Sequence, residues 1–221
     1  PVAVALATTT AGAEIRYTLD GSEPTAASPR YTGPVEIGKS ARFRATALRE
    51  GGENASYSRE FAFSKSTGRP AVLNTKPNDS YTFEGASLLV DGYHSRPVFT
   101  SGAWLGYLDE PLDVTIDMGG EQSYRSVELE TLAEKGDWIF PPSSVTVWVS
   151  DNGTDFTEVA SVAVPEAKAG DADGIGRYRM QFPETSARYL KVVAQNAAAI
   201  PAWHPGAGSK GFLFVDEVVV E

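Results

Sequence analysis

The chain has 221 residues, 42% of them hydrophobic, and no cysteine, so it is a folded globular protein without disulfides, thiolate metal sites or cysteine nucleophiles. The formal net charge of −10 lies in the C-terminal part, because residues 1–66 hold 8 Lys and Arg against 7 Asp and Glu, whereas residues 67–221 hold 11 against 22. An acidic surface of this kind disfavours nucleic acid and anionic membranes as partners. No apolar run reaches the ~20 residues that cross a bilayer.

Short alternating runs fill the first third of the chain. The N-terminal stretch PVAVAL lacks the basic residues that open a signal peptide and predicts a first strand. Residues 15–19 alternate and end in the turn sequence Asp20-Gly21-Ser22-Glu23-Pro24, where Asp and Ser bond their own backbone and Gly takes a positive φ. Residues 41–48 place Ala and Phe on one face and Arg and Thr on the other, and residues 57–63 repeat the alternation. These strands predict a small β-sandwich.

Residues 65–70 (KSTGRP) have the composition of a linker, and the strands of a second unit follow it. In residues 112–118, four apolar side chains occupy one face and Asp and Thr occupy the other. Further strands are predicted over 124–132, 145–150, 177–182, 188–196 and 212–220. Many short strands separated by turns predict a second β-sandwich or jelly roll, and an all-β fold class.

Two parts of the sequence resemble known families. Residues 15–34, IRYTLDGSEPTAASPRYTGP, resemble the small immunoglobulin-like domain at the C-terminal end of chitobiases and other β-hexosaminidases of glycoside hydrolase family 20. The second unit is similar to the discoidin-like domain, also called coagulation factor 5/8 type C, which includes family 32 carbohydrate-binding modules. That resemblance lies in LLVDGYHS (88–95), WLGY (104–107), IDMGG (116–120), VTVWVSDNGTDF (145–156), ARYLKVVAQN (187–196) and the run over 202–220.

These resemblances imply two β-sandwich domains: an immunoglobulin- or fibronectin-III-like sandwich over residues 1–66 and a discoidin-like jelly roll over residues 67–221. They imply a non-catalytic accessory fragment of a secreted bacterial chitobiase or β-hexosaminidase, in which the second domain binds carbohydrate. The alternative is that both domains brace or orient a catalytic barrel and bind no sugar. The location implied is secreted, periplasmic or cell-surface.

The residues themselves offer no catalytic constellation. Family 20 catalysis uses an adjacent Asp-Glu pair in a (β/α)₈ barrel, which needs ~250 residues of its own. Asp109-Glu110 lies in a predicted loop, and Asp216-Glu217 lies on a predicted strand, where neighbouring side chains should point to opposite faces. Carboxylates on opposite faces cannot flank one glycosidic bond. The fragment is therefore predicted not to be an enzyme.

The discoidin resemblance implies one structural calcium ion between the Asp-Gly loop and the last strand. The family's ligand positions fall on the carboxylates of Asp91 and Glu217 and on the carbonyls of Leu88, Tyr93 and Asp216. Oxygen donors of this kind suit Ca²⁺, which takes roughly six to eight of them. The chain departs from the family just after the loop, where Arg96-Pro97 stands near the place of the usual Thr. No other cofactor is expected.

Carbohydrate modules hold sugars with exposed aromatic rings and a few planar polar groups. In discoidin-like modules these groups come from loops at one end of the sandwich, which gives the following candidates: Tyr93, His94, Arg96, Trp104, Trp138, Trp203 and His204. The same aromatic residues could instead pack loops, and the exposure of the rings separates the two interpretations. The expected partners are N-acetylhexosamine- or galactose-containing glycans and the catalytic domain in cis, with no nucleic acid and no membrane.

Overall fold

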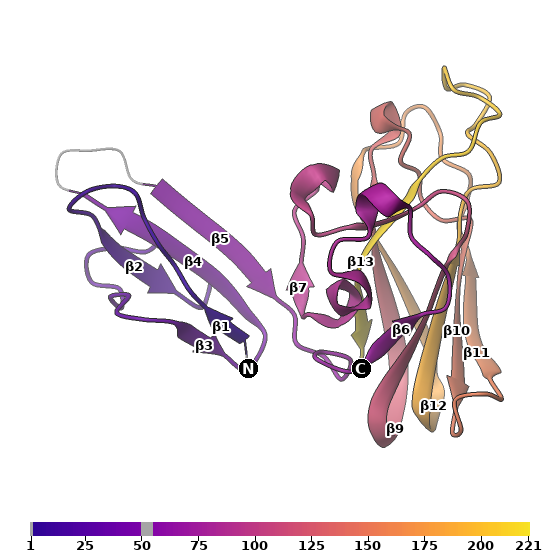
Figure 1. The fold of residues 1–221 in the computed structure, drawn as a ribbon, viewed down its shortest axis with the longest axis horizontal. Coiled ribbons are helices and arrows are strands. Elements are labelled where there is room, and N and C mark those ends of the chain that lie inside the picture. The colour runs from indigo at the N-terminus through magenta and orange to yellow at the C-terminus, as the bar shows by residue number, and fades with distance from the viewer. Residues whose placement is uncertain (1, 50–54) are drawn as a thin grey trace. The chain divides into compact units, whose positions relative to one another are not determined.

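A computed structural model describes residues 2–49 and 55–221, and the chain divides into two compact units, Pro1–Phe63 and Ser64–Glu221 (Figure 1). The regular structure in the described residues consists of β-strands and short 3₁₀-helices. The all-β fold class predicted from the sequence is confirmed.

The first unit is a small β-sandwich in which β2, β4 and β5 pair antiparallel in that order, and β1 pairs antiparallel with β3. Its strands are β1 (Val2–Val4), β2 (Glu14–Thr18), β3 (Val35–Ile37), β4 (Ala41–Leu48) and β5 (Ala55–Phe61). The alternation of β4 buries Phe43 and Ala45, and the ring of Tyr17 stacks on Phe43 with centroids 5.9 Å apart. The turn after β2 forms as predicted, because Ser22 N donates to Asp20 Oδ1 (2.9 Å) and Gly21 has φ +84°.

The second unit carries the longer strands. They are β6 (Ala71–Leu73), β7 (Tyr93–His94), β8 (Leu105–Tyr107), β9 (Leu112–Ala133), β10 (Ser144–Ser150), β11 (Thr157–Ala163), β12 (Gly174–Gln195) and β13 (Leu213–Val220). The 3₁₀-helices are η1 (Asp79–Tyr81), η2 (Gly85–Val90), η3 (Phe99–Ser101) and η4 (Lys135–Asp137). The strands follow the order β11-β10-β12-β9-β13-β8, and β6 pairs with β9.

Two strands of the second unit are longer than the sequence predicts. The strands predicted over 112–118 and 124–132 are both parts of β9, and those over 177–182 and 188–196 are both parts of β12. β9 continues through Gly119, whose φ of +80° lets the chain bend, and the register of β12 against β9 shifts twice, between Gln181 and Thr185 and between Ala187 and Tyr189. Both halves of each strand bury side chains in one core, which includes Ile116, Leu129, Met180 and Leu190.

The boundary between the units lies at 63/64, three residues before the sequence-based boundary. Residues 64–66 hydrogen-bond to the last strand of the second unit: Ser64 Oγ accepts from Val220 N (3.2 Å) and Lys65 N donates to Val220 O (3.0 Å). The hydroxyl of Ser66 is buried and donates to Val218 O (2.5 Å). The apparent linker is therefore built into the second unit.

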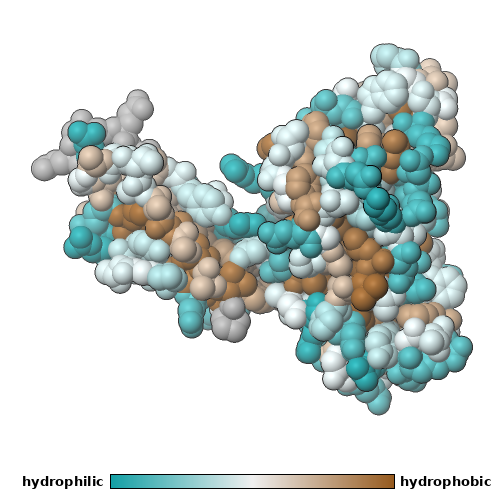
Figure 2. Space-filling model, in the orientation of Figure 1, coloured by the Kyte–Doolittle hydropathy of each residue, from teal (hydrophilic) through white to brown (hydrophobic). Residues whose placement is uncertain are grey.

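Hydrophobic residues also reach the surface of the second unit. Figure 2 shows them in brown on the visible face, beside hydrophilic residues in teal. The exposed large side chains of this unit include Phe83, Val98, Trp138 and Trp203. Among the described residues, no helix has the length and apolar character needed to cross a membrane.

Candidate functional site

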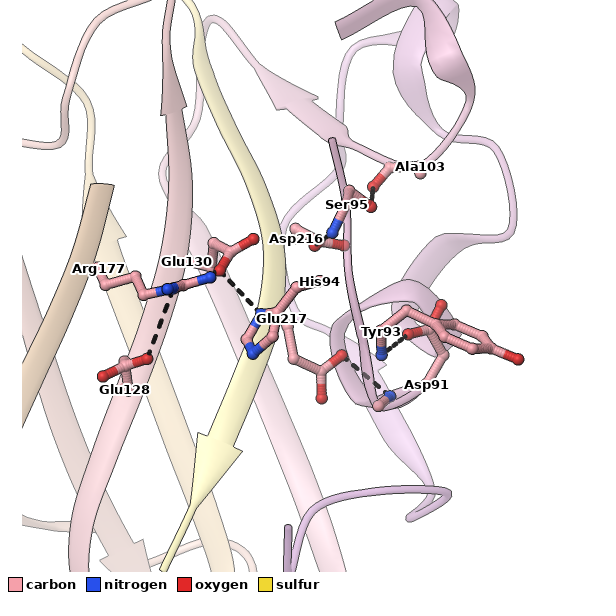
Figure 3. A network of polar contacts seen from close by, with 11 residues as sticks. Asp91, Tyr93, His94, Ser95, Ala103, Glu128, Glu130, Arg177, Asp216 and Glu217 are labelled. Atoms are coloured by element: carbon pink, nitrogen blue, oxygen red, sulfur yellow. Dashed lines mark hydrogen bonds and ion pairs between the residues drawn. The ribbon is translucent and has the colours of Figure 1, made fainter. Parts of the chain in front are cut away.

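Two neighbouring carboxylates of β13 are buried against the loop that follows η2 (Figure 3). Asp216 Oδ2 accepts a hydrogen bond from Ser95 N (2.8 Å), and Glu217 Oε2 accepts one from Gly92 N (3.2 Å). The prediction that these two side chains point to opposite faces is therefore wrong. The register of β13 against β9 shifts between Val215 and Val218, and a bulge of this kind turns adjacent residues toward the same side.

The second oxygen of each carboxylate, Asp216 Oδ1 and Glu217 Oε1, is buried and has no hydrogen-bond partner in the described chain. Burial raises the pKa of Asp216 to about 8, and the nearby charges of Glu130 and Asp91 add to the rise. Burial also raises the pKa of Glu217 to about 11, with Asp91 and Asp216 as further causes. Each carboxylate therefore needs a proton or a cation to be stable in its place.

The structure brings the two segments that carry the expected calcium ligands, the end of η2 with the following loop and β13, close to one another. Leu88 lies in η2, Asp91 caps the end of that helix, and Glu217 bonds to the backbone of the next residue, Gly92. Asp91 Oδ1 also accepts from Tyr93 N (2.7 Å), which closes the loop. No group of three or more His, Asp or Glu side chains suited to a metal occurs in the described residues. Any cation here would thus depend on two carboxylates and backbone carbonyls, which is an oxygen-only set of the kind that Ca²⁺ accepts.

His94, a candidate sugar contact, is instead part of a polar chain across the sheet (Figure 3). Its Nδ1 lies 2.8 Å from Glu130 Oε2, and Arg177 Nε lies 2.8 Å from the same oxygen. Glu130 is 1% exposed, so these two partners hold a buried carboxylate. We therefore assign His94 a structural role.

Trp104 is fully buried and belongs to a group that we call the buried aromatic cluster: Trp104, Leu132, Ile139 and Phe214, with Tyr81, Phe99 and Phe212 packed against them. The indole Nε1 of Trp104 donates to the carbonyl of Arg96 (3.0 Å), which also accepts from Val98 N (2.7 Å). The ring of Trp104 is not available to a ligand, but it fixes the backbone from which the exposed Arg96 side chain extends.

Trp138 and Trp203 form a second group, which we call the tryptophan platform. Their side chains are 42% and 40% exposed. Both rings contact His204 edge-on, with centroids 6.1 Å and 5.5 Å from the imidazole. His204 is 9% exposed, and its Nδ1 accepts from Gly206 N (3.0 Å), so it supports the two rings and does not itself face solvent.

A buried lysine holds the loops under the tryptophan platform. Lys135 is 7% exposed, its Nζ donates to Asp171 O (2.8 Å), and it forms an ion pair with Asp173. Its carbonyl oxygen lies 2.9 Å from His204 Nε2. Lys135 therefore links three loops. These are the loop that carries η4, the loop between β11 and β12, and the loop between β12 and β13, which is yellow in Figure 1.

A groove of about 360 Å³ lies beside Trp203. Its lining is mostly apolar and comprises Phe140–Ser143, Val164–Ala167 and Ala197–Ala202. Trp203 Nε1 donates to Ala167 O (2.9 Å), which fixes the indole at the edge of the groove. The carboxylate of Glu166 is the charged group in the lining. An exposed ring beside an apolar groove with a few polar groups is the usual composition of a small-ligand site.

Sequence reasoning missed two further exposed apolar side chains, Phe83 (45% exposed) and Val98 (47%). Phe83 follows η1, and Val98 precedes η3. Neither belongs to an alternating run, so the sequence carries no periodic signal that separates them from buried loop residues.

Comparison with known proteins agrees with this architecture. Residues 1–59 match the model of the chitobiase/β-hexosaminidase C-terminal domain, and residues 74–210 match the model of the F5/8 type C domain. Both are accessory rather than catalytic domain types. A search of curated proteins found no match.

The chain is also similar to solved structures of binding modules. Chitosan-binding module 1 of a chitosanase/glucanase from Paenibacillus sp. IK-5 is 17% identical, with 72% of this chain and 98% of that chain covered and a TM-score of 0.46. A Clostridium perfringens module in complex with GalNAc-β-1,3-galactose is 17% identical (68% and 93% covered, TM-score 0.46), and a Streptococcus pneumoniae fucose-binding module is 22% identical (72% and 94%, TM-score 0.45). These similarities are too low to transfer a ligand. The family match covers more than half of the residues, and the chain belongs to the F5/8 type C domain family.

Proposed function

We propose that this chain is the accessory region of an exported glycoside hydrolase of the chitobiase/β-hexosaminidase type, and that its second domain binds carbohydrate. The match of residues 1–59 to a domain named after those enzymes supports a parent enzyme of this type. The match to the F5/8 type C domain supports a binding module. Binding in cis would raise the local concentration of substrate around the attached enzyme.

The observation that carries the proposal is the exposure of Trp138 and Trp203. Large rings are usually buried because burial removes apolar surface from water, yet both indoles are about two-fifths exposed. They stand on connections fixed by buried Lys135 and His204, so a ligand would meet rings that are already in place. The apolar face of a pyranose is a suitable partner for such rings, and the adjoining groove offers space for its substituents.

The alternative function is bracing, in which the same rings dock on a catalytic domain and bind no sugar. Exposed aromatic rings are also enriched at protein interfaces, so exposure alone fits both functions. Direct binding of free sugars separates them.

A glycan array followed by calorimetry tests the proposal, with N-acetylhexosamine and galactose oligosaccharides as probes. Trp138→Ala and Trp203→Ala should each weaken binding by about three- to tenfold, which is the usual contribution of one stacked ring. Tyr57→Ala is the matched control, since Tyr57 is 41% exposed but lies in the first unit. Absence of binding at millimolar sugar would overturn the carbohydrate function and favour bracing.

We also propose that a calcium ion neutralises the acidic pair of β13, held by the carboxylates of Asp91 and Glu217 with nearby backbone carbonyls. The buried and unpartnered Glu217 Oε1 supports this proposal. A cation that binds the native state alone must raise the melting temperature, and a chelator must lower it. Glu217→Gln should abolish the response to calcium. A wild-type melting temperature that chelator and added calcium leave unchanged would overturn it.

A further inference from the structure

His204 is a buried histidine whose two ring nitrogens are both engaged, one as an acceptor and one as a donor. Its Nδ1 lies 3.0 Å from the amide nitrogen of Gly206, and its Nε2 lies 2.9 Å from the carbonyl oxygen of Lys135. A backbone N–H can only donate a hydrogen bond, and a backbone carbonyl can only accept one. Nδ1 therefore has no proton and Nε2 carries one, so these contacts require the neutral form of the imidazole.

The bond from Gly206 holds the backbone on which Trp138 rests. A Cβ atom at Gly206 would lie 2.8 Å from Cζ2 of Trp138, so the indole packs directly against this glycine. Gly206 lies in a loop over residues 200–209 that is closed by a hydrogen bond from Ile200 N to Ser209 O (2.8 Å). The position of the Trp138 ring therefore depends on a loop that His204 holds from inside.

Trp203, the other ring of the tryptophan platform, has an additional support. Its Nε1 donates to Ala167 O (2.9 Å), and its ring contacts Phe140 with centroids 6.3 Å apart. A change at His204 Nδ1 should therefore displace Trp138 more than Trp203.

Protonation of His204 at Nδ1 is incompatible with the bond from Gly206. It would place an N–H opposite the N–H of Gly206, so two donors would face each other and the hydrogen bond would be lost. Histidine is the side chain whose ordinary change of charge falls between about pH 5 and pH 8. Mild acid is therefore the condition under which this bond is at risk.

The charged groups around His204 do not compensate an imidazolium. The ring is packed among the aromatic side chains of Trp138, Phe140 and Trp203. Lys135 offers its carbonyl to the ring and directs its ammonium to Asp173. The charged side chains on the neighbouring loops are Glu134, Lys135 and Asp137 around η4 and Glu166, Lys168, Asp171 and Asp173 between β11 and β12.

None of these carboxylates forms an ion pair with His204 within residues 2–49 and 55–221. A buried charge without a partner is unfavourable, so a proton binds more easily when the loop opens and the ring meets water. The closed loop holds the neutral ring and the open loop accepts the proton. Falling pH therefore shifts the loop from closed to open.

From these contacts we propose that the tryptophan platform is acid-sensitive, because protonation of His204 breaks the bond from Gly206, loosens residues 200–209 and displaces Trp138. His204 is thus a positioning residue for the platform. The inference rests on the carbohydrate function proposed above, and it adds that a sugar bound at neutral pH is released in mild acid.

The first test is NMR of the whole chain labelled with 5-fluorotryptophan, recorded from pH 7.5 to pH 4.5 together with the imidazole signals of the two histidines. The Trp138 signal, assigned with Trp138→Phe, should shift reversibly with the same midpoint as the imidazole of His204. The signal of the fully buried Trp104 should stay constant. A Trp138 signal that does not follow His204, or an imidazole that stays neutral to pH 4.5, would overturn the inference.

Two variants separate the switch from a general effect of acid. His204→Asn keeps an oxygen that can accept from the N–H two residues on, as in an Asx-turn, but it does not titrate. Its Trp138 signal should stay constant over the same pH range, and a shift like that of the wild type would contradict the proposal. Gly206→Ala places a methyl group where the Trp138 ring lies and should displace the ring at pH 7.5. Should His204→Asn fail to fold, the wild-type midpoints still decide.

The second test is calorimetry at pH 7.5 and pH 5.0 with N-acetylglucosamine and galactose oligosaccharides. The wild-type affinity should be about three- to tenfold lower at pH 5.0, the usual contribution of one stacked ring, and that of His204→Asn should be the same at both pH values. Equal wild-type affinities at the two pH values would overturn the inference and leave the carbohydrate function standing. A protein that binds neither sugar at any pH would overturn that function and the release of sugar, and the NMR titration alone would then decide whether the loop responds to acid.

Discussion

The tryptophan platform and the acidic pair of β13 depart from ordinary packing in opposite directions. At the first, large rings such as Trp138 are exposed, although full burial of a large apolar side chain stabilises a fold by ~1.5–3 kcal/mol. At the second, the carboxylates of Asp216 and Glu217 are buried, although an unpaired buried charge is strongly unfavourable. In each region a ligand can offset the unfavourable free energy. The apolar face of a sugar would cover the exposed rings, whereas a cation or protons would neutralise the buried carboxylates.

The largest expected effect tests whether the exposed rings differ in kind from the buried ones. Trp104→Ala should lower the free energy of unfolding by ~3–5 kcal/mol, because it empties a fully buried site and leaves the carbonyl of Arg96 without its indole donor. Trp203→Ala should cost less than ~1 kcal/mol, since much of the ring is already in water. Urea unfolding of the two variants measures both values. Equal losses of unfolding free energy in the two variants would contradict the distinction between the buried aromatic cluster and the tryptophan platform.

The second-largest expected effect is a pH dependence of the free energy of unfolding, caused by the buried carboxylates. The pKa values of Asp216 and Glu217 rise from 3.8 and 4.5 to about 8 and about 11, so between pH 5 and pH 7 the folded state holds protons that the unfolded state has lost. In chelator, stability should therefore fall as pH rises, by ~1.4 kcal/mol per pH unit for each group. Glu217→Gln removes one of the two groups and should halve the slope.

Thermal or urea unfolding at pH 5, 6 and 7, with chelator and with calcium, gives these slopes. Calcium should flatten the slope of the wild type, because a bound cation replaces the protons, and should leave the slope of Glu217→Gln as it was in chelator. A wild-type slope near zero in chelator would mean that the carboxylates are neutralised by some other group.

Much of the fold follows from the sequence because alternation sets which side of a strand is buried. The strand over residues 41–48 is observed at the predicted residues, and the Asp20-Gly21-Ser22 turn forms through the predicted side-chain bond. A local sequence pattern does not show which strands pair, or in which register. The bulge that turns Asp216 and Glu217 to one side is set by the register of β13 against β9, which no short window of sequence contains.

The candidate site was predicted less completely, for a related reason. Trp104, Trp138 and Trp203 lie outside the long strands, where no periodicity separates a buried ring from an exposed one, and only tertiary packing decides among them. Phe83 gave no signal at all, since a positive φ is normally foreseen only for Gly, Asn or Asp. The sequence named Trp138 and Trp203 as candidates, and the structure supplies their exposure.

The smallest expected effect sharpens the contrast between the buried acids and an exposed one. Asp117 is partly exposed and has partners: Arg188 Nη2 lies 2.8 Å from its Oδ2, and Gly119 N donates to its Oδ1 (2.9 Å). The bond from Arg188 and then that from Gly119 lower the pKa of Asp117 to about 2. Its contribution is therefore present above about pH 4 and is lost as the pH falls toward 2, opposite in sign to that of Glu217. Solvent screening keeps such pairs weak, so Asp117→Asn should lower the melting temperature at pH 7 by only about 1–2 °C, and the difference should vanish near pH 2. A melting-temperature difference that persists at pH 2 would show that the variant disturbs the bend of β9 at Gly119 and not the charge.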